Sequence, residues 1–312
     1  MADALFDLGD WAGDPLHPGA ETVTPVELVA RLSPTDRRHR VRALINQADE
    51  ILTDALERHA GGRAIVATCL LWSGGNDSNT LAHLMRHKAT HAVHANTGIG
   101  IEATRQFVRD QCTAWGLPLI EKHPPAGSTY REIVLDQGFP GPAHHWKMYQ
   151  RLKERALRQA RAELIGNPRR ERIVFLAGRR RSESDRRADV PLFERDGSVI
   201  WASPLAMWTK LDLNTYRTMH DDVPHNPVVD HLHMSGECLC GSFAKPGERE
   251  QIRDWSPETD AQISALETEA RAAGVPEPRC RWGWGADTKA RASDRVGRLC
   301  SSCTLDLFGN AA

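Results

Sequence analysis

The sequence predicts an α/β fold: a doubly wound, mostly parallel, Rossmann-like sheet followed by a loop-rich C-terminal part that carries cysteines. Short apolar runs alternate with segments of helical periodicity, as in βαβ units. One of these runs opens directly into the glycine-rich turn Ser73–Ser78. The 312 residues contain 7 cysteines, most of them near the C-terminus. The chain is long enough to bury a sizeable core, and we expect a reducing environment in which clustered thiols serve as metal ligands or redox groups.

The elements divide the chain into three regions. We expect a helical segment over residues 1–60, an α/β domain over 61–225 and a cysteine-rich region over 226–312. The first region contains two helices after residue 24, and the last contains one amphipathic helix near 256–273. In the middle region the predicted strands are 64–72, 91–98, 117–123, 172–178 and 199–205, and the predicted helices are 79–88, 101–116, 146–165 and 211–220.

Composition excludes several classes of protein. The formal net charge is -1, which argues against binding nucleic acid through bulk charge. No apolar run approaches the ~20 residues that span a bilayer, and the acidic N-terminus does not have the layout of a secretory signal. We therefore expect a cytoplasmic protein with no membrane partner.

The strongest local signal is the turn Ser73-Gly74-Gly75-Asn76-Asp77-Ser78 between a strand and a helix. Backbone amides of such a turn, together with the positive end of the helix, form an anion site. Ser73 and Ser78 add hydroxyl donors, and Asp77 is positioned to hold a Mg²⁺ that bridges phosphates. The spacing differs from the P-loop, and the plain alternative is a tight turn that only caps the helix. The pattern favours a nucleotide site.

Arginines follow a predicted strand at 179, 180, 181, 186 and 187, where ligands of an open α/β sheet bind. Their guanidinium groups suit phosphate oxygens, although a solvated run balanced by Glu183 and Asp185 is the alternative. A basic helix over 146–165 could face a nucleic acid or only solvent.

The C-terminal thiols form two close pairs, Cys238 with Cys240 and Cys300 with Cys303, and Cys280 lies between them. Two pairs from separate loops suit tetrahedral zinc or a [4Fe–4S] cluster, with Cys280 as an alternative ligand. A redox pair or buried thiols are the other interpretations. Cys69 and Cys112 are expected in the core.

The turn Ser73–Ser78 resembles the SGGxDS pyrophosphate loop of the adenine nucleotide α-hydrolase superfamily. Three further segments resemble the phosphoadenosine phosphosulfate (PAPS) reductase, or CysH-like, family. They are His94–Gly98 followed by Ile101–Thr104, Gly178–Arg187, and Ala202–Leu205 with Trp208 and Tyr216. The resemblance implies an adenine nucleotide site that adds Asn96, Thr97, Gly98, Gly178 and Ser184 to the loop, with Asp77, Arg180 and Arg187 as catalytic residues.

The sequence departs from this family at two places. Asn96 stands where the family usually has an aspartate, and the chain ends TLDLFGNAA rather than in the family's ECGLH-type tail with its nucleophilic cysteine. These departures shift the resemblance toward DndC-like proteins and toward CysH-like proteins associated with CRISPR systems or phages. Those relatives imply ATP and an iron–sulfur cluster as cofactors.

The leading hypothesis is therefore an ATP-binding enzyme that cleaves at the α-phosphate, as an ATP pyrophosphatase or adenylylating enzyme, and couples this step to sulfur transfer or redox chemistry. The alternatives are a PAPS or adenosine phosphosulfate (APS) reductase, and a non-catalytic nucleotide-binding accessory of a defence system. A nucleic-acid acceptor or a protein of a defence complex is the candidate partner.

Overall fold

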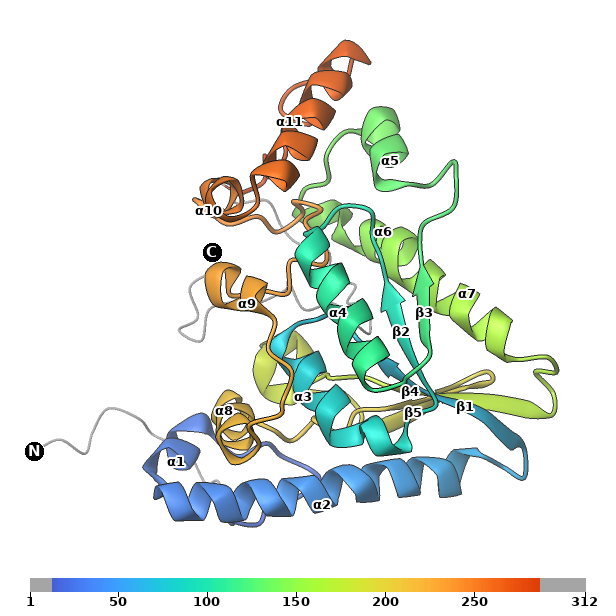
Figure 1. Cartoon of the computed structure of the whole chain (residues 1–312), viewed down its shortest axis with the longest axis vertical. Helices are drawn as coiled ribbons and strands as arrows, with labels where there is room; N and C mark the ends of the chain where they lie inside the picture. Colours follow the sequence, from blue (N-terminus) through green and yellow to red (C-terminus); the bar gives the residue numbers. More distant parts are fainter. Residues whose placement is uncertain (1–12, 287–312) are drawn as a thin grey trace, which may run out of the picture.

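The computed structural model describes residues 13–286 and shows a six-stranded sheet in the order β3-β2-β1-β4-β6-β5 (Figure 1). All neighbouring strands are parallel except β5, which pairs antiparallel with β6. This arrangement confirms the predicted α/β, mostly parallel fold. The strands are β1 (Ala64–Leu71), β2 (His91–Ala95), β3 (Leu119–Lys122), β4 (Glu171–Leu176), β5 (Phe193–Asp196) and β6 (Val199–Ala202).

Helices cover both faces of the sheet. The described α-helices are α1 (Val26–Arg31), α2 (Pro34–His59), α3 (Asn76–Met85), α4 (Glu102–Ala114), α5 (Tyr130–Gln137), α6 (His145–Met148), α7 (Arg155–Leu164), α8 (Lys210–Met219), α9 (Pro227–Leu232), α10 (Glu248–Trp255) and α11 (Pro257–Ala272). Among residues 13–286, no helix combines the length and the apolar character needed to cross a membrane.

Alternation along β1 explains the two layers. Leu70 faces the core shared with α2, α3, α4 and α8, whereas Cys69 and Leu71 face the core shared with α7. Burial raises the pKa of the Cys69 thiol to about 12 and that of Cys112 to about 12. Both thiols are thus core residues, as the sequence predicts.

A third core lies beyond the strand ends, where α5, α10 and α11 gather in the upper part of Figure 1. It joins residues from two distant parts of the sequence. Ile99, Phe139 and Leu152 come from the α/β region, and Cys240 and Trp282 come from the cysteine-rich region. Apolar contacts therefore join the residues on the two sides of position 225. The domain boundary expected there stays a prediction.

The structure differs from the predicted elements in three respects. The expected helix over 146–165 is interrupted by a π-helical segment, Tyr149–Glu154. Three helices (α9, α10 and α11) follow residue 226 where one was expected, and α5 and β5 were not predicted. β5 has the sequence FERD on an exposed sheet edge, so it lacks the apolar run by which the other strands were recognised.

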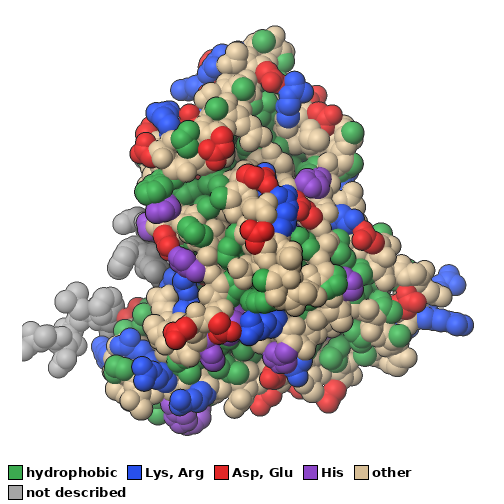
Figure 2. Space-filling view, in the orientation of Figure 1, with side chains coloured by type: hydrophobic (Ala, Val, Ile, Leu, Met, Phe, Trp, Pro, Cys, Tyr) green, Lys and Arg blue, Asp and Glu red, His purple; other side chains and the backbone are tan. Residues whose placement is uncertain are grey.

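The visible surface has no region of one charge. On the face shown in Figure 2, acidic and basic side chains are interspersed over the whole molecule. This distribution is consistent with the formal net charge of -1.

Candidate nucleotide site and cysteine pair

The turn Ser73–Ser78 joins β1 to α3, as predicted. Gly74 has φ +75, and a Cβ at this residue would lie 2.8 Å from Cγ2 of Thr104. Both the backbone conformation and the space therefore require glycine. Gly75 is the N-cap residue of α3, and among the described residues no side chain caps this helix. The first-turn amides of α3 are thus left to a ligand, as an anion site requires.

Buried amide side chains donate hydrogen bonds to the backbone of the turn. Asn79 and Asn226 both donate to the Gly74 carbonyl, at 3.2 Å and 3.0 Å. Asn226 also donates to Thr104 Oγ1 at 3.1 Å, and Thr104 Oγ1 donates to the Ser235 carbonyl at 2.5 Å. Sequence reasoning missed Asn226 because its partners lie more than 100 residues away in the chain. Its only local signal is the Asn-Pro pair that starts α9.

Arg180 contacts the turn through Asp77. Arg180 Nε lies 2.7 Å from Asp77 Oδ2, and a second guanidinium nitrogen donates to Ser182 Oγ at 3.0 Å. Gly178 allows this approach, since a Cβ there would lie 3.2 Å from the carbonyl carbon of Asp77. The structure therefore brings together Asp77, Gly178 and Arg180, three of the residues expected at the site.

Asp77 keeps one oxygen for a magnesium ion. Arg180 engages Oδ2, and Mg²⁺ at nucleotide sites is commonly bound through one or two carboxylates plus phosphate oxygens. The residues present therefore fit a Mg²⁺ shared between Asp77 and a bound nucleotide.

The remaining arginines of the run have different surroundings. Arg179 is buried against Ser203 and Glu194, and Arg181 donates to the backbone carbonyls of residues 20, 21 and 190. These two arginines hold the fold together. Arg187 is buried and pairs with Glu183 at 2.6 Å, in the same short segment as Ser184. The catalytic role expected for Arg187 stays a prediction.

Asn96, Thr97 and Gly98 form a tight strap after β2. Asn96 Nδ2 donates to Glu121 Oε1 at 2.7 Å, and Asn96 Oδ1 accepts the Gly98 amide at 3.0 Å. The Arg109 guanidinium, helped by the hydrogen bond from the Asn96 amide, lowers the pKa of Glu121 to about 2, although burial alone would raise it. An amide rather than a carboxylate at position 96 is therefore matched to an ionised Glu121.

The strap leads to the first cysteine pair. Thr97 Oγ1 donates to the Glu237 carbonyl at 2.9 Å, and the Leu239 amide donates to the Ile99 carbonyl at 2.7 Å. At the other end of this segment, Ser235 Cβ lies 3.3 Å from where a Cβ on Gly75 would be. The segment 235–240 thus runs from the turn 73–78 to the thiols.

Cys238 and Cys240 lie side by side. A hydrogen bond between the two thiols lowers the pKa of Cys240 and raises that of Cys238. His145 and Ser242 also hydrogen-bond to Cys240. These two thiols fit two positions of a four-thiolate site.

Among the described residues, the remaining candidate ligand is Cys280. Cys280 is buried, and its hydrogen bond to Glu277 raises the pKa of the Cys280 thiol. Within residues 13–286, no three His, Cys, Asp or Glu side chains gather as a metal site. Cys300 and Cys303 lie outside the described residues. Trp282 Nε1 donates to the Leu239 carbonyl at 2.7 Å and so covers the thiol loop, whereas Trp284 binds the Phe139 carbonyl.

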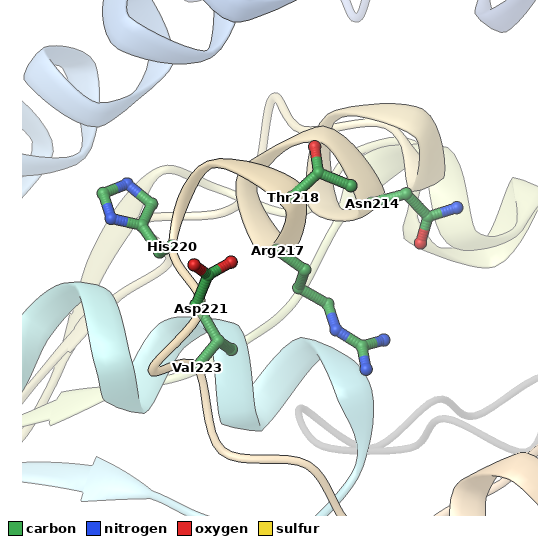
Figure 3. Close-up of a pocket in the computed structure, with 6 residues that line it drawn as sticks. All are labelled: Asn214, Arg217, Thr218, His220, Asp221 and Val223. Atoms are coloured by element: carbon green, nitrogen blue, oxygen red, sulfur yellow. The ribbon is translucent and has the colours of Figure 1, made fainter.

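One further cation reaches the turn from α8. Arg217 Nη1 donates to Asn76 Oδ1 at 3.0 Å. Arg217 also lines a pocket of ≈ 370 Å³ with Asn214, Thr218, His220, Asp221 and Val223 (Figure 3). The sequence carried no signal for Arg217, which follows Tyr216 in an ordinary helical segment.

Several curated proteins are similar to part of this chain. An adenosine 5'-phosphosulfate reductase of Chelativorans sp. (strain BNC1) is 34% identical over 84 residues, which are 27% of this chain and 34% of that protein. A phosphoadenosine 5'-phosphosulfate reductase of Photobacterium profundum is 24% identical and is matched over 65% of this chain and 79% of its own length. The chain spans only about a third of the length of the first curated relatives it matches.

Two solved structures overlap with the fold. One is a phosphoadenylyl-sulfate (PAPS) reductase from Candida auris in a phosphate complex, with 20% identity and a TM-score of 0.42 over 64% of this chain and 92% of that one. The other is the U34-tRNA thiolase NcsA from Methanococcus maripaludis with its [4Fe–4S] cluster, with 15% identity and a TM-score of 0.41 over 84% and 88%.

The family model named phosphoadenosine phosphosulfate reductase domain matches residues 67–237, more than half of the chain. The match contains the turn 73–78, the strap 96–98 and the arginine run 179–187, and it ends one residue before Cys238. The chain belongs to the phosphoadenosine phosphosulfate reductase domain family.

Proposed function

We propose that this chain is an enzyme that binds ATP on the turn 73–78, cleaves it at the α-phosphate and couples this step to sulfur transfer. One observation carries the proposal. The segment 235–240 contacts the turn 73–78 at Ser235 and bears the hydrogen-bonded thiols Cys238 and Cys240 three and five residues later. Sulfur chemistry at these thiols would therefore take place beside the nucleotide.

The groups of the turn would stabilise the charge that develops during cleavage. An acceptor oxygen would attack the α-phosphorus, a bond to the acceptor would form, and the bond to pyrophosphate would break. Amides of the first turn of α3 and the Arg180 guanidinium would bind the oxygens of the departing pyrophosphate. Mg²⁺ bound at Asp77 would neutralise further phosphate charge.

The cysteines supply the second half of the proposal. Cys238 and Cys240, with Cys300 and Cys303 or with Cys280, would hold a [4Fe–4S] cluster or, alternatively, zinc. A cluster would provide sulfur delivery or electrons to the adenylylated acceptor. A cytoplasmic location belongs to this proposal, because Cys238 and Cys240 are free thiols even though they are neighbours.

The second candidate is a sulfonucleotide reductase. The names of the curated relatives favour it. In that reaction a thiolate attacks the sulfur of a phosphosulfate, the nucleotide leaves, and a second thiol releases sulfite.

Product analysis distinguishes these functions. Protein purified without oxygen is incubated separately with ATP, APS and PAPS, with and without Mg²⁺ and a dithiol reductant. Release of AMP and pyrophosphate from ATP, lost in Asp77→Ala and kept in the control Asp54→Ala at a half-exposed residue of α2, would support the proposal. Sulfite release from APS or PAPS would replace it with the reductase. Nucleotide binding without any turnover would indicate the non-catalytic accessory of a defence complex, with a nucleic acid or protein partner.

A further inference from the structure

The arginine side chains near the turn 73–78 differ in whether a carboxylate pairs with them. Arg180 contacts the carboxylate of Asp77 at 2.7 Å, and Arg187 contacts that of Glu183 at 2.6 Å. Arg217 touches the turn as well, through Asn76, but it forms no ion pair with a carboxylate anywhere in residues 13–286. Its charge is therefore available at the turn.

The second partner of Arg217 is also uncharged. Arg217 Nη2 lies 2.9 Å from His225 Nδ1, and His225 Nε2 lies 2.5 Å from Asp230 Oδ2. A guanidinium can only donate, so Nδ1 of His225 must accept and carries no proton. The imidazole proton is then on Nε2, where it is donated to Asp230. His225 is neutral in this arrangement, and it orients Arg217 without cancelling its charge.

The place of Arg217 in the fold gives it access to a ligand. Asn76 is the first residue of α3, so the guanidinium lies at the positive, uncapped end of that helix. Arg217 is only partly buried and lines the ≈ 370 Å³ pocket together with the amide of Asn214, the hydroxyl of Thr218 and the carboxylate of Asp221 (Figure 3). The pocket is thus connected to the turn 73–78 through Arg217.

We propose that Arg217 is a phosphate-binding residue of the nucleotide site, and that it takes an anionic group beyond the one held by the amides of the turn. A guanidinium with neutral partners keeps donors and charge for a phosphate oxygen. The favoured ligands are nucleotides with a pyrophosphate or triphosphate end, compared with the monophosphate. This inference rests on the nucleotide-binding function proposed above.

Calorimetry with a series of probes tests this role. Wild type, Arg217→Ala and Arg217→Lys are titrated with ATP, inorganic pyrophosphate, AMP and adenosine. Loss of a charge-assisted contact should weaken ATP and pyrophosphate binding about 10- to 100-fold in Arg217→Ala, with less than about a 3-fold change for adenosine. Arg217→Lys should bind with intermediate affinity. Arg195→Ala is the matched control, because Arg195 is exposed on β5 and binds only a carbonyl of its own turn.

A further variant separates direct contact from support of the loop. If Arg217 acted only by holding Asn76, Asn76→Ala would reproduce the defect, and adding Arg217→Ala to it would cost nothing more. That result, or an equal loss for ATP and adenosine, would overturn the role of Arg217. Unchanged ATP and pyrophosphate affinity in Arg217→Ala would overturn it too and leave the proposed function intact. Absence of binding of all four probes to the wild type would overturn both.

Discussion

Asn96→Asp, which introduces the aspartate that the sequence resemblance implies at this position, should destabilise this chain. Asn96 is 3% exposed, and its amide nitrogen lies 2.7 Å from Glu121 Oε1. Glu121 is ionised, because the Arg109 guanidinium binds both of its oxygens at 2.8 Å and holds its pKa at about 2. Asn96→Asp keeps the size of the side chain but replaces the donor by an oxygen.

The size of the effect follows from this geometry. The substitution removes a hydrogen bond to a charged group, which contributes about 1.5–3 kcal/mol, and places two carboxylates in contact. Two such groups cannot both be ionised, so the pKa of the new aspartate must rise. At pH values above the raised pKa, each unit by which the pKa of the aspartate rises lowers the free energy of unfolding by about 1.4 kcal/mol. We expect a total loss of about 2–4 kcal/mol near pH 7.5.

The stability loss in Asn96→Asp should depend on pH. A carboxyl whose pKa is higher in the folded than in the unfolded state lowers stability as the pH rises through the interval between the two values. The loss in Asn96→Asp should therefore be largest at pH 7–8 and become small near pH 4. Urea unfolding monitored by tryptophan fluorescence over this range measures it.

A second substitution provides the control. In Asn96→Asp with Glu121→Gln, the donor and the acceptor exchange places, and Arg109 keeps a carboxylate nearby. The double variant should regain most of the stability at pH 7.5. A single variant as stable as the wild type, or a loss that does not change between pH 4 and 8, would refute the reasoning.

Three other predictions follow from the same structure. Gly75→Val should abolish ATP binding in calorimetry and leave the circular dichroism spectrum unchanged. Asp77→Ala should weaken Mg²⁺-dependent ATP binding more than metal-free binding. Unchanged ATP affinity in both variants would contradict the nucleotide site. Protein prepared without oxygen should contain about four irons per chain by colorimetric assay, and Cys280→Ser should keep them; stoichiometric zinc in colourless protein would instead indicate a structural metal. Arg40→Met should cost about 3–5 kcal/mol in urea unfolding, because it leaves Asp212, whose side chain is 0% exposed, without its charged partner; a loss below about 1 kcal/mol would show that the buried pair contributes little.

Most of the fold could be predicted because its signals are local. The predicted strands β1, β2, β3, β4 and β6 each contain buried apolar residues and lie between turn signals or helices, which is typical of strands in a mostly parallel sheet. β5 has a local signal of a different kind, the Asp196-Gly197 turn that joins it to β6. The strand order could not be read, since it depends on which strands meet after folding.

The site could be predicted only where consecutive residues form it. The turn 73–78 was recognised because its glycines, serines and aspartate act together within one bend. The arginine run was harder, because neighbouring side chains after a strand point in different directions. Arg180 reaches Asp77, whereas Arg179 and Arg181 anchor the fold. Asn226 and Arg217 contact the turn only through tertiary structure, so no spacing in the sequence could indicate them.

The connection between the turn and the thiols could not be predicted from composition. By composition this region begins near residue 226 and looks separate from the α/β body. Its segment 235–240, however, is bound by backbone hydrogen bonds from Ile101 to Gly236 and from Leu239 to Ile99, on either side of Gly100. Gly100 packs so closely there that a Cβ would lie 2.2 Å from the Glu237 carbonyl oxygen. Because the same segment supports Thr104 and contacts Gly75, the position of Cys238 is set by the residues that shape the turn 73–78, and the two sites are parts of one packed unit.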